Sequence, residues 1–93
     1  MEELDELTWE TQYLLKWINE DKNLRDAIWT LGNDCYTGRC KYPFEKALRV
    51  YIGEMVKVSI WKYPRQIREY PRNLRNSQRL INWKEVAIRF TVI

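Results

Sequence analysis

Residues 9–24, WETQYLLKWINEDKNL, combine the clearest helical period in the chain with its densest aromatic content. Large apolar side chains recur here at offsets of four, five, eight and nine residues, along one side of a helix; they are Trp9, Tyr13, Leu14, Trp17 and Ile18. Burying each of these groups stabilises a fold by about 1.5–3 kcal/mol. We therefore expect a helix from about Trp9 to Ile18, with Thr8 as its N-cap, whose apolar side faces the core.

Helix-boundary residues predict further helices after this one. Asp21 can cap a second helix, and Gly32 supplies a stop signal at its C-terminal end. Residues 33–42 follow as an exposed loop that turns at Gly38. Pro43 suits the first turn of a third helix, which we expect to be the longest.

The last predicted helix begins at Asn82. Glu85 follows at the spacing of a capping box, and Ile81 and Val86 can form a hydrophobic staple across the cap. The side chains that we expect in the core are Trp9, Trp17, Leu48, Ile52, Trp83 and Val86.

These elements predict an all-α fold, a compact bundle of four to five short helices in a single domain, residues 1–93. Three glycines and three prolines, with 45% hydrophobic residues, agree with a compact helical chain. The alternative is an α+β fold with a small two-stranded sheet. In residues 56–61, Val56, Val58 and Ile60 alternate with Lys57, Ser59 and Trp61 as in a strand. Residues 88–93, IRFTVI, can pair with them.

A seven-residue unit occurs twice in residues 63–76, as YPRQIRE and YPRNLRN. Each proline is expected to open a short helical turn, and each preceding tyrosine is expected to be extended. On a helical backbone the arginines lie along one side, while Ile67, Leu74 and Ile81 dock on the core from another. We therefore predict a partner-binding surface composed of Tyr63, Arg65, Arg68, Tyr70, Arg72, Arg75 and Arg79.

Charge is distributed unevenly along the chain, whose formal net charge is +3. Residues 1–40 hold four Lys or Arg and nine Asp or Glu, whereas residues 41–93 hold twelve and four. Two interpretations remain open. Either the acidic first half lies against the basic second half, or a basic face is reserved for a partner.

The sequence contains no histidine, no glycine-rich phosphate loop and no paired nucleophile and base. We therefore expect no enzymatic activity, no catalytic residue and no cofactor. Cys35 and Cys40 are too few ligands for a closed zinc site, so we expect reduced thiols, with a labile disulfide as the alternative. Four acidic residues lack calcium-loop spacing and are better explained as solvated caps than as a metal site; they are Glu20, Asp21, Asp26 and Asp34.

Both ends of the chain carry a motif. Residues 10–24 contain an E-T pair, an apolar run and then K-W-I-N-E-D-K-N-L, and residues 81–87 read INWKEVA. The two segments resemble a family of small proteins from phages and related mobile elements, with the pattern E-T, L/K-W-I-x-[NE]-D-x-x-L and a later V/I-D/N-W-x-E-I/V-A. The family's N-D pair is Glu20-Asp21 here, and Arg25 stands where an aromatic residue is usual. The resemblance implies a mobile-element origin and supplies no activity or catalytic residues.

We expect a small binding protein that acts on a host protein or nucleoprotein complex, for example as a counter-defence inhibitor similar to anti-CRISPR proteins. The alternative is direct RNA or DNA binding through the basic residues 62–79. Arginine grips phosphates and carboxylates alike, and tyrosine stacks on bases or anchors protein interfaces, so the residues do not separate the two. The opening MEELDEL is acidic, and no apolar run is long enough to span a membrane. We expect a monomer or small homo-oligomer in the cytoplasm of the host cell, without a membrane partner.

Overall fold

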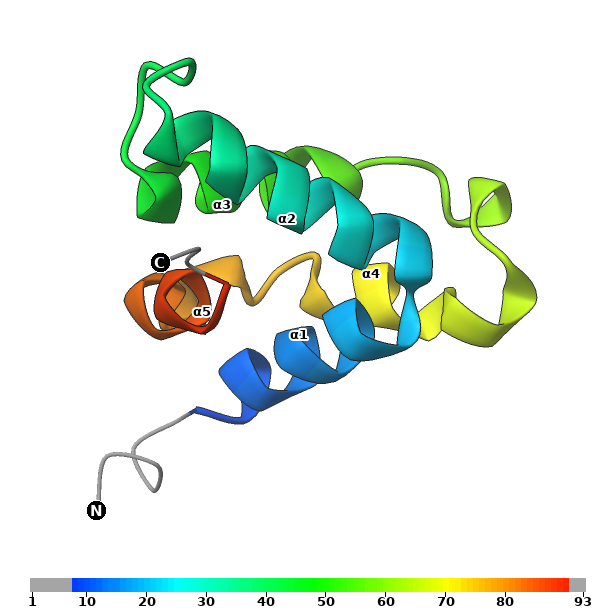
Figure 1. Cartoon of the computed structure of the whole chain (residues 1–93). Coiled ribbons are helices and arrows are strands. Elements are labelled where there is room, and N and C mark those ends of the chain that lie inside the picture. Colours follow the sequence, from blue (N-terminus) through cyan, green and yellow to red (C-terminus); the bar gives the residue numbers. More distant parts are fainter. Residues whose placement is uncertain (1–7, 91–93) are drawn as a thin grey trace.

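The computed structural model describes residues 8–90, in which five α-helices and three short 3₁₀ helices occur and no strand is present (Figure 1). The α-helices are α1 (Trp9–Glu20), α2 (Lys22–Tyr36), α3 (Phe44–Met55), α4 (Glu69–Leu74) and α5 (Trp83–Arg89). The 3₁₀ helices are η2 (Ile60–Lys62), η3 (Arg65–Ile67) and η4 (Gln78–Leu80). The predicted all-α bundle is confirmed, and no helix in this part of the chain is long and apolar enough to cross a membrane.

The two-stranded sheet of the α+β alternative is wrong for the described residues. In residues 56–61 the backbone N–H groups of Lys57 and Val58 donate to carbonyls at the end of α3, and the chain then enters η2. These hydrogen bonds close helical turns, so the same groups are not available to a sheet. The described part of residues 88–93 completes α5 and its last turn, and residues 91–93 lie outside the described residues.

The helices enclose one core, because α3 packs against α2 and α5 while α1 packs against α2, α4 and α5 (Figure 1). Five of the predicted core residues are buried; they are Trp17, Leu48, Ile52, Trp83 and Val86. The prediction for Trp9 is wrong, since its side chain is 59% exposed. Trp9 is the first residue of α1 and stacks on Tyr13, with 4.6 Å between the ring centroids. The core begins one turn further on, at Leu14.

Both predicted caps of α1 and α2 are present. The Thr11 N–H donates to Thr8 Oγ1 at 3.1 Å, and the Leu24 N–H donates to Asp21 Oδ1 at 3.2 Å. Asp21 also accepts a hydrogen bond from the indole N–H of Trp17 through Oδ2, at 3.3 Å. The junction between α1 and α2 is therefore tied to the most deeply buried aromatic side chain of the core.

Gly32 does not stop α2, contrary to the prediction. The helix continues through Gly32 to Tyr36 and, with 15 residues, is longer than α3, which has 12. A Cβ atom at Gly32 would lie 3.0 Å from the ring of Phe44 and 3.3 Å from the carbonyl oxygen of Phe90. The absence of a side chain at Gly32 therefore lets α2 pack closely against Phe44 and Phe90.

The predicted turn at Gly38 is confirmed by its φ of 84°. Pro43 precedes the first residue of α3 as its N-cap.

The capping box predicted at α5 is half formed. Asn82 Oδ1 accepts the Glu85 N–H at 3.1 Å, as predicted. Glu85 does not reach back to the N–H of Asn82, which donates to Thr11 Oγ1 at 2.7 Å. Glu85 instead pairs with Arg89, with 3.3 Å between Oε2 and Nε.

Candidate functional site

The two tyrosines of the predicted partner-binding surface are core residues, and their assignment to that surface is corrected. Tyr63 is 8% exposed and Tyr70 is 4% exposed, and both rings pack on Trp17. The Tyr63 hydroxyl donates to the carbonyl of Met55 at 2.6 Å, and the Tyr70 hydroxyl donates to the Glu20 carboxylate at 2.5 Å. Sequence alone did not show this, because a tyrosine beside a proline and an arginine is equally typical of a surface.

Burial shifts the acidity of both hydroxyls. Burial raises the pKa of Tyr70 to about 12, and the hydrogen bond to Glu20 and its negative charge contribute in the same direction. Burial also raises the pKa of Tyr63, with a smaller effect from the charge of Asp21. Both tyrosines therefore act as neutral hydrogen-bond donors at neutral pH.

The arginines of the repeat do not form one stripe, because residues 63–81 are divided among short helices and turns. Tyr63 is extended, as predicted, with φ −98° and ψ 150°. Tyr70 is not: it lies within α4, where Pro71 occupies the third position. A proline is tolerated there because the first N–H groups of a helix have no partner within it. Ile67 and Leu74 are buried as predicted.

The arginines themselves differ in what surrounds them. Arg65 on η3 and Arg79 on η4 are exposed. Arg68 is half-buried and is fixed by two contacts. Its Nε donates to the carbonyl of Tyr63 at 2.9 Å, and its guanidinium lies 5.1 Å from the ring centroid of Trp61.

Arg72 and Arg75 border a hollow that the end of α3 helps to form. The hollow has a volume of about 360 Å³, and its other lining residues are Val56, Lys57, Val58, Ser59 and Ile60. It adjoins a second hollow of about 340 Å³ through Lys57, which both share. The second is lined by Lys46, Arg49, Val50, Gly53, Glu54, Lys57 and Gln78.

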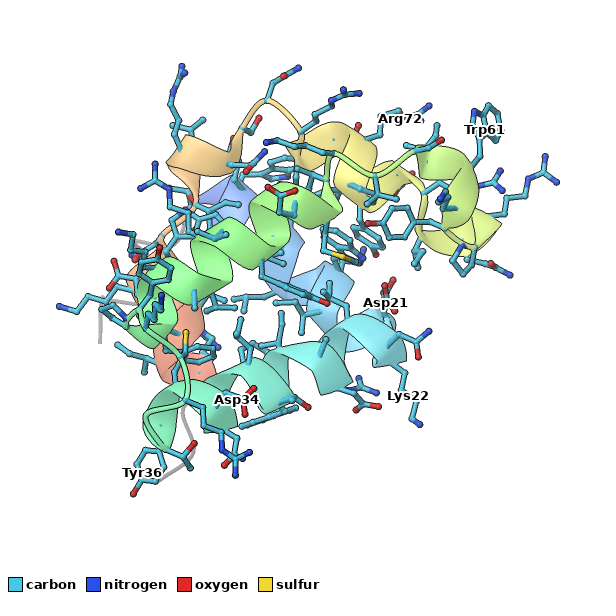
Figure 2. All side chains as sticks on the ribbon, turned by 90° about the horizontal axis from the view of Figure 1, so that it is seen from above. Asp21, Lys22, Asp34, Tyr36, Trp61 and Arg72 are labelled. Carbon is cyan, nitrogen blue, oxygen red and sulfur yellow. The ribbon has the colours of Figure 1, made fainter. Side chains whose placement is uncertain are left out.

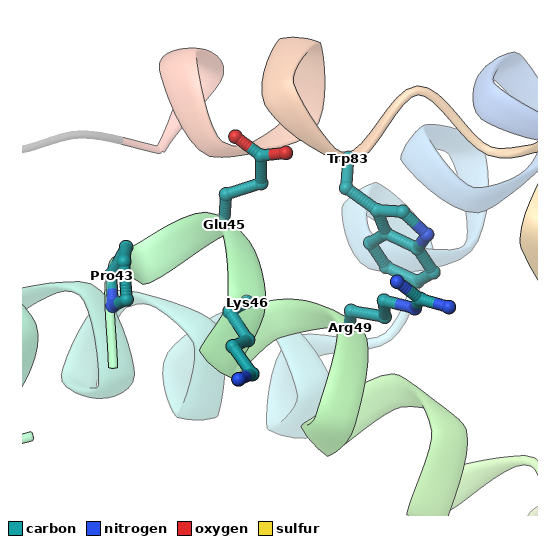
Figure 3. A pocket seen from close by; sticks show the side chains of 5 residues that line it. All are labelled: Pro43, Glu45, Lys46, Arg49 and Trp83. Carbon is teal, nitrogen blue, oxygen red and sulfur yellow. The ribbon is translucent and has the colours of Figure 1, made fainter. Parts of the chain in front are cut away.

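A third hollow of about 350 Å³ continues the row, since it shares Lys46 and Arg49 with the second. Figure 3 shows it between α3 and α5, with the side chain of Arg49 extending toward the indole ring of Trp83. Pro43 and Glu45 complete its lining. We call these three adjoining hollows the α3 groove.

The α3 groove is positively charged. Its lining holds five cationic side chains, Lys46, Arg49, Lys57, Arg72 and Arg75, and two carboxylates, Glu45 and Glu54. Lys57 Nζ lies 3.9 Å from Glu54 Oε2, but both side chains are about 70% exposed, so water screens this pair. Among the described residues every ion pair joins side chains three or four positions apart. In this part of the chain, the acidic first half does not neutralise the groove through ion pairs.

The acidic side chains and cysteines form no metal-binding cluster in the described part of the chain. Within residues 8–90 no three His, Cys, Asp or Glu side chains are placed to hold a metal ion. Cys35, in the last turn of α2, and Cys40, in the segment between α2 and α3, are free thiols. Burial raises the pKa of the Cys35 thiol to about 11, and a hydrogen bond with Cys40 adds to the shift.

Sequence reasoning missed the α3 contribution to the site, namely Lys46, Arg49 and Lys57. The signal was present for Lys46 and Arg49, since their spacing of three residues places them on one side of a helix, away from the buried Leu48 and Ile52. Lys57 lies in the turn that follows the end of α3. Tertiary packing brings Arg72 and Arg75 next to these residues of the groove. A single sequence does not show such packing. The chain matches no protein-family model, no curated protein and no solved structure.

Proposed function

We propose that the protein binds nucleic acid through the α3 groove and catalyses no reaction. The observation that carries this proposal is the meeting of two basic segments in one groove. Arg72 and Arg75 come from the repeat, while Lys46, Arg49 and Lys57 come from α3 and its end. Cations lined up along a groove are the usual means of following a phosphate backbone.

The dimensions of the groove fit several phosphates. Within α3, the rise from Lys46 to Met55 is about 14 Å at roughly 1.5 Å per residue. A stacked strand advances roughly 3.4 Å per nucleotide, so this part alone spans about four nucleotides. The hollow at Arg72 and Arg75 extends the contact beyond the end of α3. Arginine adds a planar fork that can hold two phosphate oxygens at once.

The resemblance to phage and mobile-element proteins supports the proposal that this nucleic-acid binding takes place in a host cell. A binder of this kind acts on host RNA, DNA or a nucleoprotein complex, including one that belongs to a defence system. This step rests on analogy with the phage and mobile-element proteins and is independent of the contacts described above.

The test measures fluorescence anisotropy of labelled oligonucleotides over roughly 50–200 mM salt. Five phosphate contacts predict a slope of log affinity against log salt of about −3.5 on a single strand and −4.5 on a duplex. Arg49→Ala should weaken binding and flatten the slope by about 0.7–0.9. Arg39→Ala is the matched control, because Arg39 is exposed in the segment between α2 and α3 and lines none of the three hollows.

Absence of binding to any oligonucleotide would overturn the proposal. So would a host protein that stays bound after nuclease treatment and is released by Arg49→Ala, because the groove would then recognise an acidic protein surface.

A further inference from the structure

We infer that Trp61, held by Arg68, is a stacking platform for an unpaired base at the end of the α3 groove, so that the protein prefers single-stranded nucleic acid. The inference rests on the proposed function, because it names which form of nucleic acid the groove receives. It adds a contact to the base, whereas the groove itself contacts phosphates.

Trp61 is the most exposed tryptophan among the described residues, at 73%. It lies in η2, a turn in which Ser59 Oγ accepts the backbone N–H of Trp61 at 3.4 Å. Trp17 and Trp83, in contrast, are buried in the core. Since the ring of Trp61 contributes little to the core, folding does not explain a tryptophan at this position.

Arg68 fixes the orientation of the indole. Its guanidinium lies over one face of the Trp61 ring, 5.1 Å from the centroid, and its Nε is tied to the carbonyl of Tyr63 at 2.9 Å. A guanidinium over an aromatic face is held by a cation–π attraction. With 73% of the side chain exposed, the opposite face is left for a base, which would complete a sandwich of guanidinium, indole and base.

The platform adjoins the groove. The residues that lead into Trp61, Val58, Ser59 and Ile60, line the same hollow as Arg72 and Arg75. Figure 2 shows Trp61 and Arg72 at the same end of the molecule, with the indole pointing outward. A strand whose phosphates lie on the groove can therefore place a base on Trp61. A continuous duplex cannot do so, because its bases are stacked on one another inside the helix.

The experiment compares three probes by anisotropy or by competition: short oligothymidine, the same strand in a duplex with oligoadenosine, and inorganic polyphosphate, which has charge but no base. The wild type should bind oligothymidine more tightly than the duplex. Trp61→Ala should weaken oligothymidine binding about tenfold or more and leave polyphosphate binding unchanged. Trp61→Phe should keep part of the affinity because a phenyl ring also stacks. Trp9→Ala is the matched control, since Trp9 is 59% exposed but lies at the start of α1 and lines none of the hollows.

The outcomes separate the inference from the proposed function. If none of the three probes binds the wild type, the proposed function fails and the inference fails with it. If Arg49→Ala weakens binding while Trp61→Ala has no effect on oligothymidine, the groove stands and the platform is overturned. The platform is also overturned if Trp61→Ala weakens polyphosphate binding to the same extent, because the substitution would then act through the charges. A base-specific loss in Trp61→Ala that Trp61→Phe partly restores supports the platform.

Discussion

The backbone N–H of Asn82 donates a hydrogen bond to the side-chain oxygen of Thr11 across 71 positions of sequence, at 2.7 Å. Thr11 is completely buried. Its own hydroxyl lies 2.7 Å from that of Thr8, which in turn donates to the carbonyl of Leu80 at 2.9 Å. A hydroxyl has one hydrogen, so Thr11 must be the donor toward Thr8. The chain of hydrogen bonds joins the start of α1 to the start of α5.

Thr11→Val should lower the free energy of unfolding by about 1–3 kcal/mol, because valine keeps the shape but leaves the N–H of Asn82 without its acceptor. Thr11→Ser is the control, since it retains the hydroxyl and removes one methyl group, worth about 0.8 kcal/mol. Urea unfolding followed by circular dichroism measures both. A valine variant as stable as the wild type would show that water replaces the threonine oxygen at no cost.

Trp17→Ala should be the most damaging change in α1, because Trp17 is completely buried and contacts Tyr63 and Tyr70. The expected loss is about 3–5 kcal/mol, comparable to the whole stability of a small domain. Trp9→Ala should cost only about 1 kcal/mol, since it removes an exposed stacking contact with Tyr13. Thermal melting of the two variants checks the difference. Equal losses would mean that Trp9 belongs to the core, as its spacing predicted.

Local signals in the sequence were sufficient for most of the fold. Thr8, Asp21 and Asn82 are caps because their side chains satisfy N–H groups only three residues away, within reach of pattern reasoning. Where the partner comes from a distant element, the same reasoning was wrong. The backbone N–H of Asn82 donates to Thr11 and not to the side chain of Glu85. Gly32 packs against Phe44 and does not end its helix.

The same distinction between local signals and contacts from distant elements applies to the candidate site. The arginines of the repeat stood out in the sequence, but their grouping depended on a continuous helix that the chain does not form. Arg72 and Arg75 face the end of α3 because Leu74, between them, is buried in the core. The burial of Tyr63 and Tyr70 reverses the prediction that they are exposed, because Trp17 offers both rings a surface that a linear reading does not show.

Stability should fall as the pH rises from about 10 to about 12, partly because of Tyr70. Its pKa is raised from 10.0 to about 12 in the folded protein, mainly by burial and next by the hydrogen bond to Glu20. Above pH 10 the unfolded chain releases this proton while the folded chain retains it. The folded state then binds more protons, so the free energy of unfolding decreases with pH; below pH 10 the contribution is fully present.

Tyr70→Phe should make this decline shallower, because the variant has no proton to lose at that position. Urea unfolding of both proteins across the alkaline range gives the two slopes. The other alkaline groups, Tyr63 included, remain in both proteins and serve as the internal reference. Parallel curves would show that the Tyr70 hydroxyl ionises equally easily in the folded and unfolded chains.

Two pairs of arginines from one segment offer the sharpest test of the groove. Arg72→Glu with Arg75→Glu changes the net charge as much as Arg65→Glu with Arg79→Glu, but only the first pair lines a hollow of the groove. The groove pair should reduce oligonucleotide affinity at least about a hundredfold, because two phosphate contacts become repulsive. The other pair should reduce it only several-fold, since the Debye length is about 8 Å at physiological salt.

Folding should be little affected in either double variant, because exposed charges contribute at most about 1 kcal/mol each, and melting curves check this. The comparison distinguishes a site from a general field. If the groove is the binding site, the loss of oligonucleotide affinity depends on which arginines are replaced. If the protein binds through a diffuse positive surface, the loss depends only on the change in net charge. Equal losses from the two pairs would therefore remove the α3 groove as the binding site, even if the protein still bound nucleic acid.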